Sequence, residues 1–221
     1  MLVHALEGHR IWSAQYDEQQ NPVLALEMRL LRDRIGQLEG CTFLDVAVGT
    51  GRWMQIAQFR GARVFGVDLC PEMLHCAALK PGLAGRVALA DACELPVRSS
   101  SIDLAVCSLA LGYFAEPRSA VREMARVARS VIISDLHPQT SAAGWKRGFR
   151  VAGQPYELEH RPYSERELWD YAQEAGLVEE WKIEACFGEP ERELFVLAGK
   201  EQLFNELQGF PALLTTAWRR T

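Results

Sequence analysis

The stretch Phe43-Leu-Asp-Val-Ala-Val-Gly-Thr-Gly-Arg-Trp53 constrains the fold more than any other part of this 221-residue sequence. An apolar run typical of a buried strand ends at a turn with two glycines, and a helical pattern follows. Gly49 and Gly51 allow the backbone to turn sharply and a ligand to approach without meeting a Cβ. The following helix would direct its first free N–H groups toward that ligand. These residues alone predict either a nucleotide-type site or a plain tight turn between a strand and a helix.

Strands and helices alternate with short loops on both sides of this stretch. A helix is expected within residues 22–38, because Pro22 suits a first helical turn and Gly40 suits a stop. The alternation predicts βαβ units and a parallel sheet that helices cover on both faces. The expected strands are Thr42–Val46, Ala62–Val67, Arg86–Ala90, Ile102–Ser108 and Ser130–Ser134, and the expected helices are Arg52–Phe59, Pro71–Leu79 and Arg118–Ala128.

The pattern changes after Asp135. Residues 150–160 look like a hairpin, and Ser164 with Glu167 forms a capping box for a helix that reaches Ala175. A last antiparallel strand pair is expected at Val178–Phe187 and Glu193–Gly199, and the tail from Phe204 to Thr221 is left without an element. We therefore predict one α/β domain over residues 1–221, a Rossmann-like three-layer sandwich. Its sheet is seven-stranded and mostly parallel with an antiparallel last strand, with N-terminal helices within 1–40 and a small cap at about 137–163.

Composition limits the classes of function. The formal net charge of −5 disfavours nucleic acid as a partner, which normally binds a basic face. No apolar run reaches the length of a membrane span, and the first residues lack a signal-peptide pattern, so we expect a cytoplasmic protein without a membrane partner. The six cysteines show no C-x-x-C spacing, and no metal site is expected.

Two acids follow the ends of expected strands. Asp68 comes about 17 residues after Gly51, where a carboxylate can accept both hydrogen bonds of a ribose diol, although it could instead cap the next helix. Asp91 follows the third strand and suits an adenine amino group, although it could be a solvated loop acid. A nicotinamide oxidoreductase is a competing interpretation, but it would require a full G-x-G-x-x-G, which this chain lacks.

Four motifs together resemble class I S-adenosylmethionine-dependent methyltransferases, of the methyltransferase type 11 kind. The resemblance covers residues 20–135 well. The motifs come in that family's order and spacing: Leu44-Asp-Val-Ala-Val-Gly-Thr-Gly51, Gly66-Val-Asp-Leu-Cys-Pro-Glu-Met-Leu74, Ala90-Asp-Ala-Cys-Glu-Leu-Pro96 and Ser101-Ile-Asp-Leu-Ala-Val-Cys-Ser-Leu-Ala-Leu111.

The resemblance implies S-adenosylmethionine as cofactor and a set of residues that bind it. The glycine loop would hold the amino-acid part, Asp68 the ribose, and residues near Asp91 the adenine. The implied cofactor-binding residues are Tyr16, Asp45, Ala47, Gly49, Gly51, Trp53, Asp68, Leu69, Met73, Asp91, Ala92, Cys93, Ser108 and Leu109. Ala47 stands where the family has its first loop glycine, so we expect a slightly reshaped loop that still binds the cofactor.

The implied reaction is an in-line displacement at the sulfonium methyl, which depends on positioning and needs a base only when the acceptor must lose a proton. His137, after the fifth strand, is the candidate base, and a loop residue with local hydrogen bonds is the alternative. The candidate acceptor-binding residues are Tyr113, His137, Trp145, Arg147, Arg150 and His160, which could equally belong to a solvated, charged hairpin. We predict methyl transfer to a small molecule; the alternative is a non-catalytic protein of the same fold that binds S-adenosylmethionine or senses a metabolite.

Overall fold

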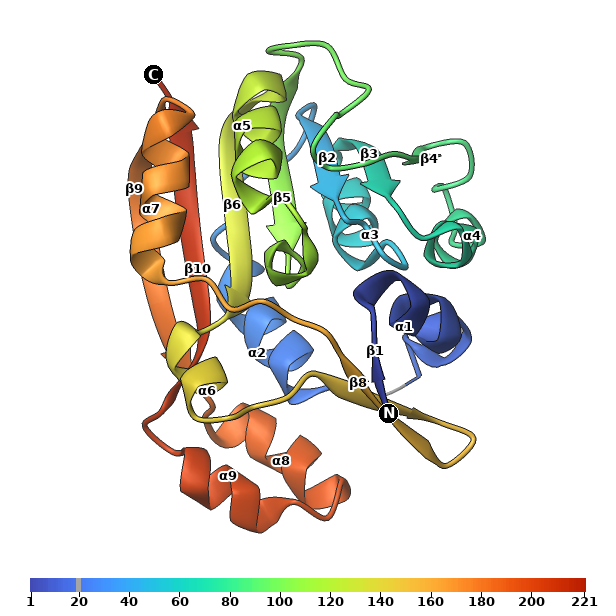
Figure 1. Ribbon diagram of the computed structural model, residues 1–221. Coiled ribbons are helices and arrows are strands. Elements are labelled where there is room, and N and C mark those ends of the chain that lie inside the picture. Colours follow the sequence, from blue (N-terminus) through green and yellow to red (C-terminus); the bar gives the residue numbers. More distant parts are fainter. Residues whose placement is uncertain (19–20) are drawn as a thin grey trace.

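The computed structural model describes residues 1–18 and 21–221 (Figure 1). Seven strands form one sheet in the order β4-β3-β2-β5-β6-β10-β9. All neighbouring pairs are parallel except those of β10, which runs antiparallel to both β6 and β9. This confirms the predicted α/β class and the antiparallel last strand. The strands are β2 (Thr42–Val46), β3 (Arg63–Asp68), β4 (Val87–Leu89), β5 (Ile102–Ser108), β6 (Ala128–Leu136), β9 (Leu177–Cys186) and β10 (Pro211–Arg220).

Helices cover both faces of the sheet. On one face, α3 (Arg52–Phe59) and the segment after α2 (Pro22–Leu31) pack against Val106. On the other, α5 (Pro117–Val127) and α7 (Glu165–Glu174) pack against Ala105 and Cys107. Successive strand residues point to opposite faces, so a strand covered on both faces is apolar throughout. This is why residues 104–107 of β5 form a continuous apolar run in the sequence.

A second, three-stranded sheet forms the cap that follows β6. The short helix α6 (Pro138–Ala142) leads into the hairpin of β7 (Gly148–Val151) and β8 (Gln154–Leu158). The N-terminal strand β1 (Leu2–Val3) adds to β8 in parallel, which the sequence did not predict. Helix α1 (Ala5–Trp12), followed by the turn η1 (Ser13–Gln15), packs on this sheet, where Trp12 and Phe149 stack with ring centroids 4.7 Å apart.

The expected strand at 193–199 is wrong. Residues Glu189–Leu197 form helix α8, and α9 (Glu201–Leu207) follows it. Pro190 lies in the first turn of α8, and the Glu191 carboxylate accepts the Gly188 N–H at 2.9 Å, both of which are signals of a helix start. The second strand of the pair is instead β10, in the tail for which the sequence predicts no helix or strand. Because β10 is buried between β6 and β9, its sequence lacks the alternation that marks a half-exposed strand.

The carboxyl ends of the parallel strands face the other elements. Figure 1 shows α1, α2, the cap sheet, α8 and α9 gathered beyond this edge of the main sheet. Ligands of open α/β sheets bind in a crevice outside this edge. Within the described ranges, 1–18 and 21–221, no helix is long and apolar enough to span a membrane.

Candidate active site

The glycine loop between β2 and α3 lies at this edge. Gly49 and Gly51 both have positive φ values, 53° and 85°. A Cβ on Gly49 would meet nothing within 4 Å, whereas a Cβ on Gly51 would lie 2.9 Å from Leu83. The two glycines therefore differ in function. Gly51 permits close packing at the start of α3, and Gly49 leaves open space at the surface of the loop.

Ala47 also adopts the left-handed conformation, with φ of 58°. A side chain in this region costs roughly 1–2 kcal/mol of conformational energy relative to the right-handed region. The alanine thus takes the backbone conformation that a glycine would adopt without strain. Such strain persists only where the surrounding structure holds the backbone in place.

Asp68 closes the loop from the end of β3. Its Oδ2 accepts the N–H of Gly49 at 2.8 Å, and its Oδ1 accepts the N–H of Cys70 at 2.8 Å. Burial raises the pKa of this carboxyl, and the two backbone donors oppose the shift. An ionised carboxylate offers about four acceptor positions, so the oxygens retain capacity for two hydroxyl donors. Next to it, Leu69 exposes 52% of its surface as an apolar side chain.

The other residues implied for the cofactor fall into two groups. Along the edge, Asp91 is exposed and accepts the Cys93 N–H at 2.8 Å, with the Cys93 thiol held at a pKa of about 11 by burial. Away from solvent, Trp53 and Met73 are 2% and 1% exposed and pack in the core. The edge also carries Ala92 after β4, and Ser108 and Leu109 at the end of β5. Asp45 is buried within β2, and this burial raises the pKa of its carboxyl.

A buried polar network that the sequence did not reveal supports the loop from below. Glu27 of α2 is fully buried, and its carboxylate accepts hydrogen bonds from Arg52, from Ser134, and from Ser108 at 2.7 Å. Trp53 Nε1 donates to the same carboxylate at 3.2 Å. The network fixes the Arg52 guanidinium at the first residue of α3, directly after the glycine loop.

The Nη1 group of Arg52 in this network is buried, and within residues 1–18 and 21–221 it has no hydrogen-bond partner. An unmatched guanidinium N–H at the start of a helix is suited to a carboxylate, because the helix dipole and the cation both attract an anion. The amino-acid part of S-adenosylmethionine carries such a carboxylate. The open side of Gly49, the free acceptor capacity of Asp68 and the Arg52 donor thus fit this cofactor.

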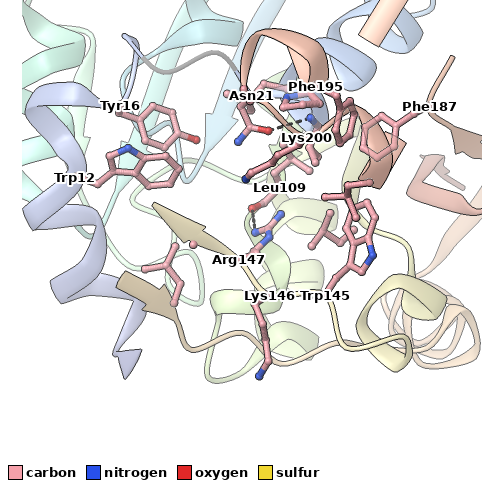
Figure 2. Close-up of a pocket in the computed structure, with 18 of the residues that line it drawn as sticks. Trp12, Tyr16, Asn21, Leu109, Trp145, Lys146, Arg147, Phe187, Phe195 and Lys200 are labelled. Carbon is pink, nitrogen blue, oxygen red and sulfur yellow. Dashed lines mark hydrogen bonds between the residues drawn. The ribbon is translucent and has the colours of Figure 1, made fainter. Parts of the chain in front are cut away.

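A cavity of about 400 Å³ extends from the end of β5 toward the cap (Figure 2). It brings together five residues predicted from the sequence: Tyr16, Leu109, Tyr113, Trp145 and Arg147. Its other lining residues come from the N-terminal segment, from β6 and the cap, and from the region of α8 and α9. These include His9, Trp12, Asn21, Phe187, Phe195 and Lys200. No local motif could have indicated them, because they are far apart in the sequence and meet only in the fold.

Arg147 is held firmly at the floor of this cavity. Its Nη2 donates to Asp135 Oδ1 at 2.9 Å, and its Nη1 donates to the Leu109 carbonyl at 2.6 Å. The guanidinium also lies over the Tyr113 ring, 4.8 Å from its centroid. The pKa of the fully buried Asp135 is lowered because Arg147 and its hydrogen bonds outweigh the effect of burial. Arg147 therefore fixes the geometry between β5, β6 and the cap.

His137, Arg150 and His160 do not line the cavity. His137 is buried beneath α6, where its Nδ1 accepts the Gln139 N–H at 3.2 Å and its Nε2 lies 3.4 Å from Glu184. Arg150 is exposed on β7 and donates to the Gly153 carbonyl at 3.2 Å. His160 packs under Gly112, with its Nε2 3.5 Å from Asp135. These surroundings indicate local structural contacts for all three side chains.

Comparison with known proteins agrees with this geometry. A family model described as a methyltransferase domain matches residues 44–131, which span β2 to β6 and include the glycine loop and the acids after β3 and β4. Residues 44–131 are thus similar to a methyltransferase domain. The fold around this domain is that of class I methyltransferases: a crystal structure of an S-adenosylmethionine-dependent methyltransferase from Mesorhizobium loti matches 90% of this chain and 100% of its own, with a TM-score of 0.70 at 22% identity.

Curated relatives of this chain include two methyltransferases. A malonyl-[acyl-carrier protein] O-methyltransferase from Hamiltonella defensa is 34% identical over 95 residues, or 43% of this chain and 36% of its own length. A demethylmenaquinone methyltransferase from Renibacterium salmoninarum is 33% identical over 114 residues, or 50% of this chain and 48% of its own length. The chain thus spans less than half the length of either relative. The cofactor that this family implies is S-adenosylmethionine.

Proposed function

We propose that the protein transfers a methyl group from S-adenosylmethionine to a small molecule bound in the cavity. The observation that carries the proposal is the position of the cavity, which includes Leu109 at the end of β5 and Tyr16. Leu109 directly follows Ser108, whose hydroxyl accepts a hydrogen bond from Arg52 Nη2 at 3.1 Å. The loop that would hold the donor and the space that would hold the acceptor therefore meet at one point.

The chain's own residues would bind and orient the cofactor. Asp68 would accept hydrogen bonds from the ribose diol, Arg52 Nη1 would donate to the carboxylate, and Leu69 would cover one face of the adenine. When bound, the cofactor supplies a methyl group already activated on a sulfonium, which leaves positioning and exclusion of water to the protein. Asp91, Ala92 and Cys93 would lie at the polar edge of the adenine.

Few groups in the cavity could move a proton. His9 is one, because its Nδ1–H donates to the Ala5 carbonyl at 2.7 Å and leaves a lone pair on Nε2. Tyr16 and Tyr113 keep their protons at neutral pH, since burial raises the pKa of both. The aromatic rings of Trp12, Tyr16 and Tyr113 would exclude water from the reacting methyl group. This cavity suits an acceptor atom that needs little or no help in losing a proton.

Calorimetric titration followed by a turnover assay tests the proposal. S-adenosylhomocysteine should bind at one site, and NAD, a dinucleotide that the loop spacing does not suit, should give no heat. Purified protein with S-adenosylmethionine and a panel of small carboxylates, phenols and amines should then release S-adenosylhomocysteine with at least one acceptor. Absence of cofactor binding would refute the donor assignment. Binding without turnover on any acceptor would favour a non-catalytic protein that binds the same ligand.

A further inference from the structure

The charge of the cavity differs from that of the whole chain. The sequence carries 24 basic and 29 acidic residues, for a net charge of −5. In the described part of the chain, the residues that line the cavity include Lys146, Arg147 and Lys200, but no aspartate or glutamate. A basic cavity in an acidic protein indicates a ligand of negative charge.

Two of these three cations are already balanced by carboxylates. Arg147 pairs with the buried Asp135 at 2.9 Å. Lys146 pairs with Glu157 at 2.9 Å, and Figure 2 shows its side chain extending away from the other labelled residues. Neither charge therefore remains available for a ligand without breaking an existing ion pair.

Lys200 is the third of these cations. It is exposed at the start of α9, and within residues 1–18 and 21–221 its ammonium makes no ion pair and no hydrogen bond. The adjacent carboxylate, Glu201, is bound by Arg192 at 2.6 Å. In Figure 2, Lys200 lies on the same side of the cavity as Asn21 and Phe195. An unpaired ammonium at the rim of a cavity is a ready partner for an anion.

An apolar wall continues from Lys200 toward the floor of the cavity. The rings of Trp145 and Phe187 are stacked, with centroids 5.9 Å apart and planes 15° apart. Phe195 meets Phe187 edge-on, with centroids 5.0 Å apart. Leu24 and Leu203 also line the cavity. Aromatic and aliphatic side chains of this kind bind flat or extended apolar groups by burying their surface.

We infer that the acceptor is an anionic molecule with a flat or extended apolar body, whose carboxylate or phosphate binds Lys200. This inference rests on the proposed function, since it names the class of acceptor for the same site. The apolar body would lie along Trp145, Phe187 and Phe195, which directs its far end toward Leu109. In that orientation the anionic group stays at the rim and the methylated atom lies deeper in the cavity.

Calorimetry with three matched ligands tests the inference. The probes are 2-naphthoate, 2-naphthyl phosphate and the neutral isostere 2-naphthamide, each titrated with and without saturating S-adenosylhomocysteine. The unmodified protein should bind an anion more tightly than the amide, and the preferred anion distinguishes a carboxylate from a phosphate acceptor. Lys200→Gln should reduce the preference about threefold to fivefold, the scale of one partly exposed ion pair. Lys146→Gln is the control and should leave the preference intact.

Each contrary result overturns the inference. Equal binding of the anions and the amide would show that charge does not select the acceptor, and absence of heat with all three ligands would show that the cavity takes no such body. A preference that survives Lys200→Gln, or that Lys146→Gln also removes, would show that Lys200 is not the anion partner. These outcomes are separate from the proposed function, because they are read without turnover and also in the absence of cofactor.

Discussion

Lowering the pH from 7.5 to 5 should destabilise the protein through His9. This side chain lines the cavity, donates from Nδ1 to the Ala5 carbonyl and lies edge-on to the Tyr113 ring at 4.9 Å. Burial lowers the pKa of its imidazole from 6.5 to about 4, and the charge of Arg147 adds to the shift. The native protein therefore keeps His9 neutral under conditions in which an unfolded chain would protonate it.

The sign and size of the effect follow from these two pKa values. Because the native pKa is the lower one, the contribution of His9 to stability is fully present above pH 6.5 and is lost as the pH falls toward 4. At pH 5 the unfolded imidazole is mostly protonated and the native one mostly neutral. Since pH 5 lies roughly 1.5 units below the unfolded pKa of 6.5, the loss amounts to about 2 kcal/mol of unfolding free energy.

Urea unfolding followed by circular dichroism at pH 7.5 and pH 5 measures this loss. Other groups also titrate over this range, so the comparison is with His9→Gln, whose amide stays neutral and can still donate to the Ala5 carbonyl. The carboxylates and the other histidines contribute equally to both proteins. The unmodified protein should lose about 2 kcal/mol more than the variant. Equal losses in the two proteins would show that the folded protein does not hold His9 in its neutral form.

Two substitutions test the loop itself. Asp68→Ala should weaken binding of S-adenosylhomocysteine by about 1–3 kcal/mol, the cost of losing hydrogen bonds to a charged group, whereas Asp33→Ala, at an exposed carboxylate, should not. Calorimetry measures both, and unchanged affinity in a folded Asp68→Ala protein would contradict the ribose assignment. Ala47→Gly should raise the unfolding free energy by about 0.5–1 kcal/mol, because relief of the left-handed alanine exceeds the added chain entropy of glycine. Urea unfolding gives this difference, and a less stable glycine variant would show that the alanine is unstrained.

The parallel half of the sheet was predictable because its local signals agree with one another. Predicted and observed bounds coincide for Thr42–Val46, Arg52–Phe59 and Ile102–Ser108. The capping box at Ser164 is also present, with the Glu167 N–H donating to the Ser164 hydroxyl at 3.1 Å. The prediction was wrong in the C-terminal part of the chain, where the sequence fits two kinds of element. Residues 193–199 are apolar enough for either a strand or a helix, and only the signals at Gly188 and Pro190 distinguish them.

The candidate site likewise has a part that the sequence predicts and a part that it does not. The glycine loop and the acids after β3 and β4 are contiguous motifs, and each follows directly from the strand before it. The cavity instead depends on contacts between distant segments, such as His9 with Tyr113. An ion pair such as Glu27 with Arg52 is equally invisible, since 25 residues separate its partners and Glu27 stands in no motif. Periodicity places elements along the chain, but it does not say which of their polar side chains will meet.

The position of β10 has a consequence for how the molecule assembles. Strands β2 to β6, with the glycine loop and Asp68, come from one continuous stretch that ends at Leu136, and every connection within it joins strands that run parallel. In the part of the chain that the structure describes, strand β9 pairs with β10 alone, so it cannot join the sheet until residues 211–220 have inserted beside β6. A nascent chain that has emerged only as far as β9 therefore already contains β2 to β6, the glycine loop and Asp68, while β6 still exposes an unpaired strand edge.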